Sequence, residues 1–250
     1  MMATVTEAAP VERQVETIPQ LENGDHLTRD EFERRYDAMP DLKKAELIEG
    51  VVHMPSPVGY RKHGHPHRHL GLWLASYELA TPGVEGGNNT SIRLDLDNMP
   101  QPDEFLFIVP ECGGQAKISE DDYIERAPEL VAEVSSSTAS YDLHEKRTVY
   151  RRNGAREYIV WRVLDRQLDW FILSKGRYEP LPLAADGIYR SVVFPGLWLD
   201  PAALLAGDLA KVLAVLQQGL QSPEHTEFVN RLAQARARSA NSGSSQSKAT

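Results

Sequence analysis

The chain has 250 residues and a formal net charge of −9, with 27 Lys and Arg residues against 36 Asp and Glu residues. This acidic balance argues against broad, non-specific attraction to polyphosphate, because such binding depends on clustered cations that release counterions. The single cysteine, Cys112, excludes an intrachain disulfide and a metal cluster held by thiolates. No apolar run is long enough for a membrane helix and the N-terminus lacks the apolar core of a signal peptide, so we expect a cytoplasmic protein with no membrane segment.

The sequence predicts one folded domain between two polar tails. Residues 1–24 lack hydrophobic periodicity, and residues 221–250 become rich in Ala, Ser, Gln and Gly. Such segments bury too little apolar surface to offset the entropy of ordering, so both are expected to be disordered. Residues 25–220 are expected to form the domain.

The first predicted elements are a short helix, a hairpin arm and a longer helix. Thr28 and Glu31 have the spacing of a capping box, which predicts a helix that runs to about residue 36 and stops before Pro40. Residues 46–54 predict a strand or hairpin arm. Residues 69–79 carry apolar side chains at helical spacing and predict a helix.

The central part of the chain predicts buried strands followed by a helix. Residues 84–96 are expected to be extended, and 105–109 and 130–134 are short apolar runs typical of buried strands. Residues 142–153 predict a helix that Gly154 ends.

The C-terminal half is rich in predicted strands. These cover residues 158–163, 168–173 and 177–183, and a terminal helix is expected over 201–220. Strands that alternate with few helices indicate an α/β fold bordering on α+β, with a mixed central sheet flanked by helices.

Glu133 is a carboxylate inside an apolar run, between Ala132 and Val134. Burying an unpaired charge costs several kcal/mol, about 3–5, so a buried Glu133 must be paired, hydrogen-bonded or bound to metal. The alternative is an outward-facing position on a strand with one solvated face.

Three further residues complete the set that a metal-dependent phosphodiesterase needs. Asp103 precedes an apolar strand, Lys146 lies on the helix after Glu133, and Glu46 comes from the first strand. Acidic oxygens bind Mg²⁺ or Mn²⁺, and a lysine orients water or stabilises negative charge. The alternatives are a turn residue for Asp103, a snorkelling residue for Lys146 and an exposed strand residue for Glu46.

Four histidines occupy alternate positions, at His63, His65, His67 and His69. On a strand this spacing would place imidazoles on one face, as in a metal site. Pro66 interrupts the run and a helix begins about there, so we interpret the run as a polar loop or a fortuitous nickel-binding tract, from which one histidine could still line the active cleft.

Two groups of cations leave a local basic groove open in spite of the acidic balance. The first group is Arg61, Lys62 and Arg68, and the second is Lys146, Arg147, Arg151 and Arg152. A solvated helix face is the commoner explanation for such runs.

The chain resembles the Uma-two family of the PD-(D/E)XK restriction-endonuclease-like superfamily over about residues 27–206. The strongest stretch is Ala-Pro-Glu-Leu-Val-Ala-Glu-Val at 127–134. It continues through Ser137-Thr138, Asp142, Glu145-Lys146, Tyr150, Gly154 and Glu157-Tyr158. Supporting segments are residues 46–50, Pro102-Asp103, residues 176–178 and residues 195–197.

The resemblance implies a mixed central sheet with flanking helices and a specific site. Asp103 and Glu133 would be metal ligands for Mg²⁺ or Mn²⁺, Glu46 would assist them, and Lys146 would be the catalytic lysine. The superfamily usually has its lysine two residues after the second acid, where this chain has Ser135. The resemblance also suggests DNA as the substrate and a homodimer by analogy with related nucleases.

The leading hypothesis is an endonuclease that uses Mg²⁺ or Mn²⁺ to hydrolyse DNA phosphodiester bonds. The alternative is a catalytically inactive binding or assembly protein that keeps the nuclease fold, which the missing lysine at Ser135 would favour. A third class is a metal-free hydrolase with two carboxylates, such as a glycosidase, which leaves an inward-facing Lys146 unexplained.

Overall fold

A six-stranded mixed sheet forms the centre of the molecule in the computed structural model, which describes residues 18–136 and 139–246. The strand order is β11-β10-β9-β8-β5-β3, and only β8 and β9 are parallel. The mixed central sheet predicted from the sequence is confirmed. The strands are β3 (Val84–Gly87), β5 (Glu104–Ile108), β8 (Leu130–Ser135), β9 (Glu157–Arg162), β10 (Gln167–Ser174) and β11 (Arg177–Pro180).

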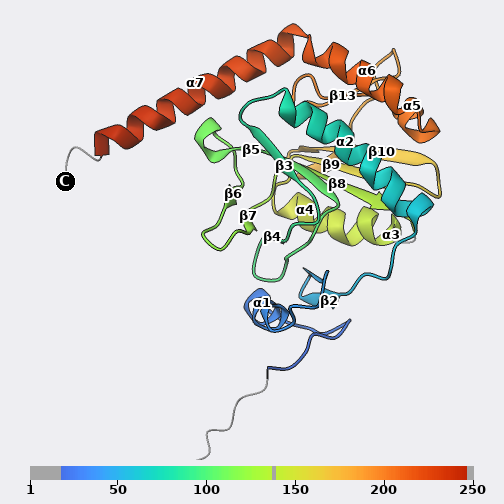
Figure 1. Cartoon of the computed structure of the whole chain (residues 1–250), viewed down its shortest axis with the longest axis vertical. Coiled ribbons are helices and arrows are strands. Elements are labelled where there is room, and N and C mark those ends of the chain that lie inside the picture. The colour runs from blue at the N-terminus through green and yellow to red at the C-terminus, as the bar shows by residue number, and fades with distance from the viewer. Residues whose placement is uncertain (1–17, 137–138, 247–250) are drawn as a thin grey trace, which may run out of the picture.

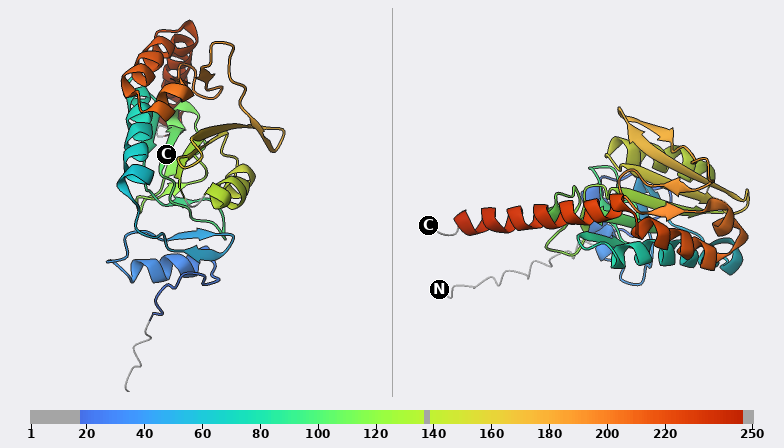
Figure 2. Two further views of the ribbon diagram at one scale, coloured as in Figure 1. Left: turned by 90° about the vertical axis from the view of Figure 1, so that its right-hand side faces the viewer. Right: turned by 90° about the horizontal axis from the view of Figure 1, so that it is seen from above.

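Helices cover both faces of this sheet. Every residue of β5 and β8 is buried, as expected for strands that pack on both sides. Helix α2 (His65–Leu79) lies on one face and α4 (Arg147–Arg152) on the other (Figure 2, left). The buried side chains of α2 recur at helical spacing and include Leu70, Trp73 and Tyr77, which explains why this amphipathic segment folds against the sheet.

The connection between β8 and β9 determines how the site is built. Parallel neighbours need a crossover, and here it consists of α3 (Ala139–Tyr141), a π-helical turn η3 (Asp142–Lys146) and α4. Gly154 follows with φ of 84°, which confirms it as the residue that ends the predicted helix. The Ser137-Thr138 pair of the family resemblance lies outside the described residues.

A small N-terminal layer lies below the sheet (Figure 1). It contains α1 (Arg29–Asp37) and the hairpin of β1 (Glu46–Ile48) and β2 (Val51–His53), with Thr28 as the helix N-cap. Its own core consists of Leu21, Phe32, Ala45, Leu47, Val52 and Met99. An isolated bridge between Leu47 and Met99 connects the hairpin to the segment that leads into β5.

The remaining elements are short turns, strands and C-terminal helices. They are η1 (Tyr60–Gly64), η2 (Pro110–Cys112), β4 (Ile92–Arg93), β6 (Lys117–Ile118), β7 (Ile124–Glu125), β12 (Tyr189–Arg190), β13 (Trp198–Leu199), α5 (Pro201–Ala206) and α6 (Leu209–Leu220). The helix predicted over 201–220 is two helices, because Gly207 adopts a left-handed conformation and Asp208 caps α6.

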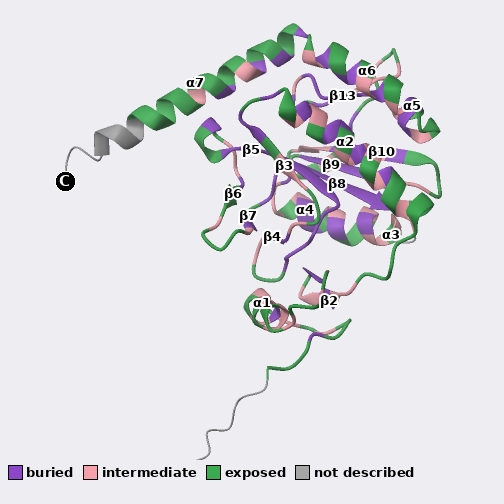
Figure 3. Cartoon of the chain, viewed as in Figure 1, coloured by how far each residue is buried: buried purple, intermediate pink, exposed green. Residues whose placement is uncertain are grey.

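The C-terminal tail differs from the sequence prediction of disorder over 221–250. Residues Pro223–Gln246 form α7, and residues 247–250 lie outside the described part. Phe228 and Leu232 are buried, and their four-residue spacing seats the first half of α7 against the domain. Residues 236–241 are exposed and belong to the part of α7 that runs outward from the domain (Figures 1 and 3). The polar average composition of residues 221–250 gave no indication that Phe228 and Leu232 form a short apolar face.

The predicted N-terminal tail, residues 1–24, is described only from residue 18 onward. Within that part Leu21 is buried, and its backbone N–H donates to Met39 Sδ at 3.2 Å. Ordered packing therefore begins before the predicted boundary at residue 25.

Candidate active site

The register of β5 and β8 places the two predicted metal ligands opposite each other. Glu104 pairs with Ala132, so the next position along the same antiparallel register sets Asp103 against Glu133. The backbone N–H of Asp103 lies 3.4 Å from Glu133 Oε2, and the backbone N–H of Val134 donates to Asp103 Oδ2 at 2.8 Å. Both carboxylates are buried.

Lys146 reaches Glu133 from the crossover helix. Its Nζ donates to Glu133 Oε1 at 3.0 Å, and Tyr150 Oη donates to the same oxygen at 3.2 Å. Asp142, Lys146 and Tyr150 follow one another at four-residue intervals, so one face of η3 and α4 is directed at β8. Lys146 lies eleven positions after Ser135 in the sequence, but the crossover places it next to the Glu133 carboxylate. It is the last residue of the π-helical turn.

Glu46 joins the network through the same lysine. Its Oε1 accepts hydrogen bonds from Lys146 Nζ at 2.9 Å and from the backbone N–H of Gln101 at 2.7 Å. Lys146 therefore bridges Glu46 and Glu133, and the three side chains are almost completely buried. The structure brings together all four predicted site residues. Lys146 contacts Glu46 and Glu133, and Glu133 in turn contacts the backbone of Asp103.

Ser135 anchors the start of the crossover that follows β8. Its Oγ donates to Asp142 Oδ2 at 2.5 Å, and Tyr158 Oη donates to the backbone carbonyl of Asp142 at 2.9 Å. These bonds fix the start of the π-helical turn against β8 and β9. Ser135 thereby helps to position the helix that carries Lys146.

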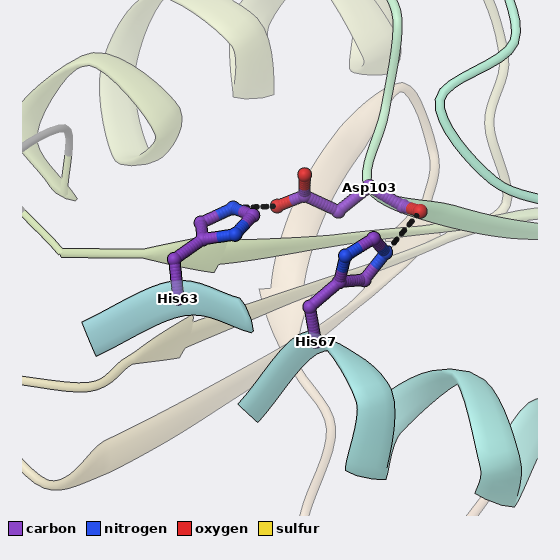
Figure 4. A group of neighbouring side chains, drawn as sticks. All are labelled: His63, His67 and Asp103. Atoms are coloured by element: carbon purple, nitrogen blue, oxygen red, sulfur yellow. Dashed lines mark hydrogen bonds and ion pairs between the residues drawn. The ribbon is translucent and has the colours of Figure 1, made fainter. Parts of the chain in front are cut away.

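The histidine run forms a helical turn, which differs from the predicted polar loop. His63 belongs to η1 and His67 to the first turn of α2. His63 Nε2 lies 3.1 Å from Asp103 Oδ2, and His67 Nε2 lies 2.9 Å from the backbone O of Asp103 (Figure 4). The helix begins earlier than predicted, and the four-residue spacing of these two histidines was the signal in the sequence.

Comparisons with known proteins give the family. Residues 29–202 match the Uma2 family model, whose description reads "Putative restriction endonuclease". The chain belongs to the Uma2 family. A solved structure described as "a putative nuclease belonging to DUF820 from Anabaena variabilis ATCC 29413" is similar at a TM-score of 0.48 and 15% identity, covering 69% of this chain and 97% of that chain. No curated protein matches the chain.

The ionised state of Asp103 in this Uma2 protein is set by its neighbours. Burial acts to raise the pKa of Asp103, but the hydrogen bond and charge of His63, the charge of Lys44 and the Val134 N–H lower this pKa to about 2. Lys44 Nζ is 3.9 Å from Asp103 Oδ1. Asp103 is therefore a carboxylate at neutral pH.

Lys146 is a cation between two buried acids. Burial acts to lower the pKa of Lys146, but the charges of Glu133 and Glu46 raise it well above its ordinary value. Burial raises the pKa of Glu133, and the charge of Lys146 opposes that rise. A protonated lysine cannot act as a general base, so its chemical contribution is positive charge and hydrogen-bond donation.

A cleft of about 1140 Å³ opens onto these residues. Its lining includes Glu46, Asp103, Glu133 and Lys146, together with the cations Lys43, Lys44, Arg61 and Lys62. Lys43, Arg61 and Lys62 are exposed and have no ion-pair partner within residues 18–136 and 139–246. Of the two groups of cations considered from the sequence, Arg61, Lys62 and Lys146 line the cleft, whereas Arg68, Arg147, Arg151 and Arg152 do not.

The residues of the cleft fit a hard divalent cation. Glu133 Oε2 has only the long contact to the Asp103 N–H, and Asp103 Oδ1 has only distant Lys44, as far as the described residues extend. Each carboxylate therefore keeps one oxygen that is weakly engaged, and carboxylate oxygens are the ligands that Mg²⁺ prefers. In Glu46, Oε1 already accepts hydrogen bonds from Lys146 Nζ and the Gln101 N–H.

No helix in the described part of the chain is long and apolar enough to cross a membrane.

The low pKa of Asp103 should make the free energy of unfolding depend on pH in acidic, metal-free buffer. A carboxyl whose pKa falls from 3.8 to about 2 on folding stabilises the folded state above pH 3.8, and this contribution is lost as the pH drops toward 2. We expect the difference in unfolding free energy between wild type and Asp103→Asn to shrink over that range, as measured by urea titration with EDTA. A difference that stays constant would contradict this assignment.

Proposed function

We propose that this Uma2 protein is an endonuclease that uses Mg²⁺ or Mn²⁺ to hydrolyse phosphodiester bonds in DNA. The observation that carries the proposal is the convergence of Asp103, Glu133 and Lys146 from three separate elements on one cleft. A buried arrangement of this kind is costly to maintain for structure alone, because each ion loses its hydration. The family description supports the same class of activity.

The residues divide the work of hydrolysis between them. Asp103 and Glu133 would hold the divalent ion, which when bound acts as a Lewis acid on a phosphoryl oxygen. Lys146 presents a fixed positive charge to the space beside Glu133, where it can orient the attacking water and stabilise the negative charge that develops on phosphorus. Glu46 and Tyr150 keep the lysine and Glu133 in place.

The rim of the cleft supports a polyanionic substrate. Lys43, Arg61 and Lys62, which have no ion-pair partner in the described part of the chain, surround the acidic centre, and phosphate contacts from such cations position a nucleic acid. His53 Nε2 and Tyr141 Oη are buried in the same cleft with no hydrogen-bond partner among the described residues. Such orphaned polar atoms indicate that the cleft accommodates polar groups that are not part of the chain.

The position of Lys146 weakens the alternative of a catalytically inactive binding or assembly protein. That alternative drew on Ser135, which stands where related nucleases have lysine. Here Lys146 nevertheless lies 3.0 Å from Glu133, so the charge that the position lacks is supplied from the next helix. The position of Lys146 therefore supports an active nuclease over an inactive protein with the nuclease fold.

Nicking of supercoiled DNA tests the proposal. Purified wild type should convert supercoiled plasmid to nicked or linear product with Mg²⁺ or Mn²⁺ and give no product in EDTA. Asp103→Asn should lower the rate about 100-fold or more, because the amide removes one charged ligand but keeps the acceptor for the Val134 N–H. Circular dichroism and thermal unfolding should show that the variant is folded.

Three outcomes would contradict the proposal. Equal cleavage by wild type and Asp103→Asn would remove Asp103 from the site. Cleavage that persists in EDTA would favour the metal-free hydrolase. A folded wild-type protein that nicks neither supercoiled nor single-stranded DNA and gives no heat with Mn²⁺ would favour the binding or assembly protein.

A further inference from the structure

A second set of metal-ligating side chains lies at the wall of the cleft. The ligand atoms of His63, His67 and Asp103 all lie within 4.8 Å of one another, and both imidazoles are directed at Asp103 (Figure 4). His63 and His67 are four residues apart in a continuous helical segment, so they share one face. Their ring centroids are 5.5 Å apart.

Glu104 adds a second carboxylate to this face. Its Oε1 lies 3.0 Å from His67 Nε2, and the side chain is almost fully buried. Gly71 is one turn beyond His67, and a Cβ at this position would overlap the Glu104 carboxylate. The sequence His, His and Gly at four-residue intervals thus presents two imidazoles and leaves room for a carboxylate on the same side of the helix.

We propose that His63, His67 and Asp103, with Glu104 beside them, form a binding site for a first-row transition-metal dication such as Zn²⁺. Imidazole nitrogen combined with carboxylate oxygen selects such ions over Mg²⁺, which prefers oxygen ligands alone. The site shares Asp103 with the Asp103 and Glu133 pair, but its nitrogen ligands come from η1 and α2. Binding at this site needs neither DNA nor turnover, so it goes beyond the proposed nuclease activity.

A simpler role for the two histidines is structural hydrogen bonding. His67 Nε2 contacts both the Asp103 carbonyl and Glu104, which would explain its position without any ion. His63 has no such backbone partner among the described residues, and its ring lines the open cleft. The ligand atoms of both imidazoles nevertheless lie within 4.8 Å of an Asp103 carboxylate oxygen at the open cleft, so the atoms that form hydrogen bonds here are also placed to ligate an added ion.

Zn²⁺ titration by calorimetry, on the full chain without an affinity tag or DNA, tests this site. We expect one strong site in wild type, weakened about tenfold or more in His63→Gln and in His67→Gln. The matched control is the double variant His65→Gln/His69→Gln, which removes the other histidine pair on this helix, whose ring centroids are 4.1 Å apart. The control should keep the affinity of wild type, and Glu133→Gln should keep it too while losing nicking.

Several results would overturn the site. These are the absence of one-to-one Zn²⁺ binding in wild type, unchanged affinity in both single variants, or loss of binding in the His65→Gln/His69→Gln control. Thermal unfolding shows whether His67→Gln folds, and if it does not, His63→Gln decides alone. Absorption spectra of the Co²⁺-loaded protein report the ligands independently, because they should change in His63→Gln and stay the same in the control.

Discussion

Lys146→Met should strongly slow DNA cleavage and destabilise the fold. The substitution leaves Glu46 and Glu133 buried without the cation that bridges them, and breaking a buried ion pair costs about 3–5 kcal/mol. Loss of a preorganised charge at the site should lower the cleavage rate about 100-fold or more. Single-turnover cleavage and urea unfolding measure the two effects.

The pH dependence of Lys146→Met separates this explanation from a simple packing defect. Without the lysine, burial keeps the pKa of Glu133 above its unfolded value, so the variant should lose stability as the pH rises above about 4.5. The deficit relative to wild type should therefore be smallest in mild acid. Lys117→Met, at an exposed ion pair with Glu125, is the control and should leave both rate and stability unchanged. A deficit in Lys146→Met that is equal at all pH values would contradict the ion-pair account.

Glu133→Gln should separate activity from stability. The variant removes one proposed metal ligand, so cleavage should fall about 100-fold or more. Its amide oxygen can still accept from Lys146 and Tyr150, and Lys146 keeps Glu46 as its counter-ion. Because a buried charge is also removed, the unfolding free energy should change by no more than about 1 kcal/mol in either direction.

Glu129→Gln is the matched control for Glu133→Gln. Glu129 directly precedes the same strand and is equally buried, but it accepts from the backbone N–H groups of Ile108 and Gln115 and does not line the cleft. It should lose stability with no loss of cleavage per folded molecule. Full activity in Glu133→Gln, or loss of activity in both variants to the same degree, would remove Glu133 from the catalytic centre.

Much of the fold was predictable because local signals agreed with burial. The apolar runs at 105–109 and 130–134 are buried strands, and the helix before Gly154 ends where its glycine indicated. The four site residues could be named from residue type and from the family resemblance. The convergence of these residues around Lys146 could not be predicted, because it depends on the register of β5 with β8 and on the direction of the crossover helix.

Two helical segments differ from the prediction because a local helical signal was present at positions where proline or polar composition indicates a loop or disorder. Pro66 predicts a break and therefore a loop at His63, yet proline is accepted in the first turn of a helix and α2 begins before it. α7 was hidden by its polar composition, although burial of Phe228 and Leu232 is enough to seat its first turns. In both segments the informative signal was a four-residue spacing, of His63 with His67 and of Phe228 with Leu232.

The most direct test of the central claim is the single-turnover rate of DNA cleavage as a function of Mg²⁺ concentration, for wild type beside Glu133→Gln. We predict a rate that is zero in EDTA, saturates with Mg²⁺ in wild type and is about 100-fold lower or less than measurable in the variant. A wild-type rate that does not depend on Mg²⁺, or equal rates in the two proteins, would contradict a metal-dependent nuclease centre built on Glu133.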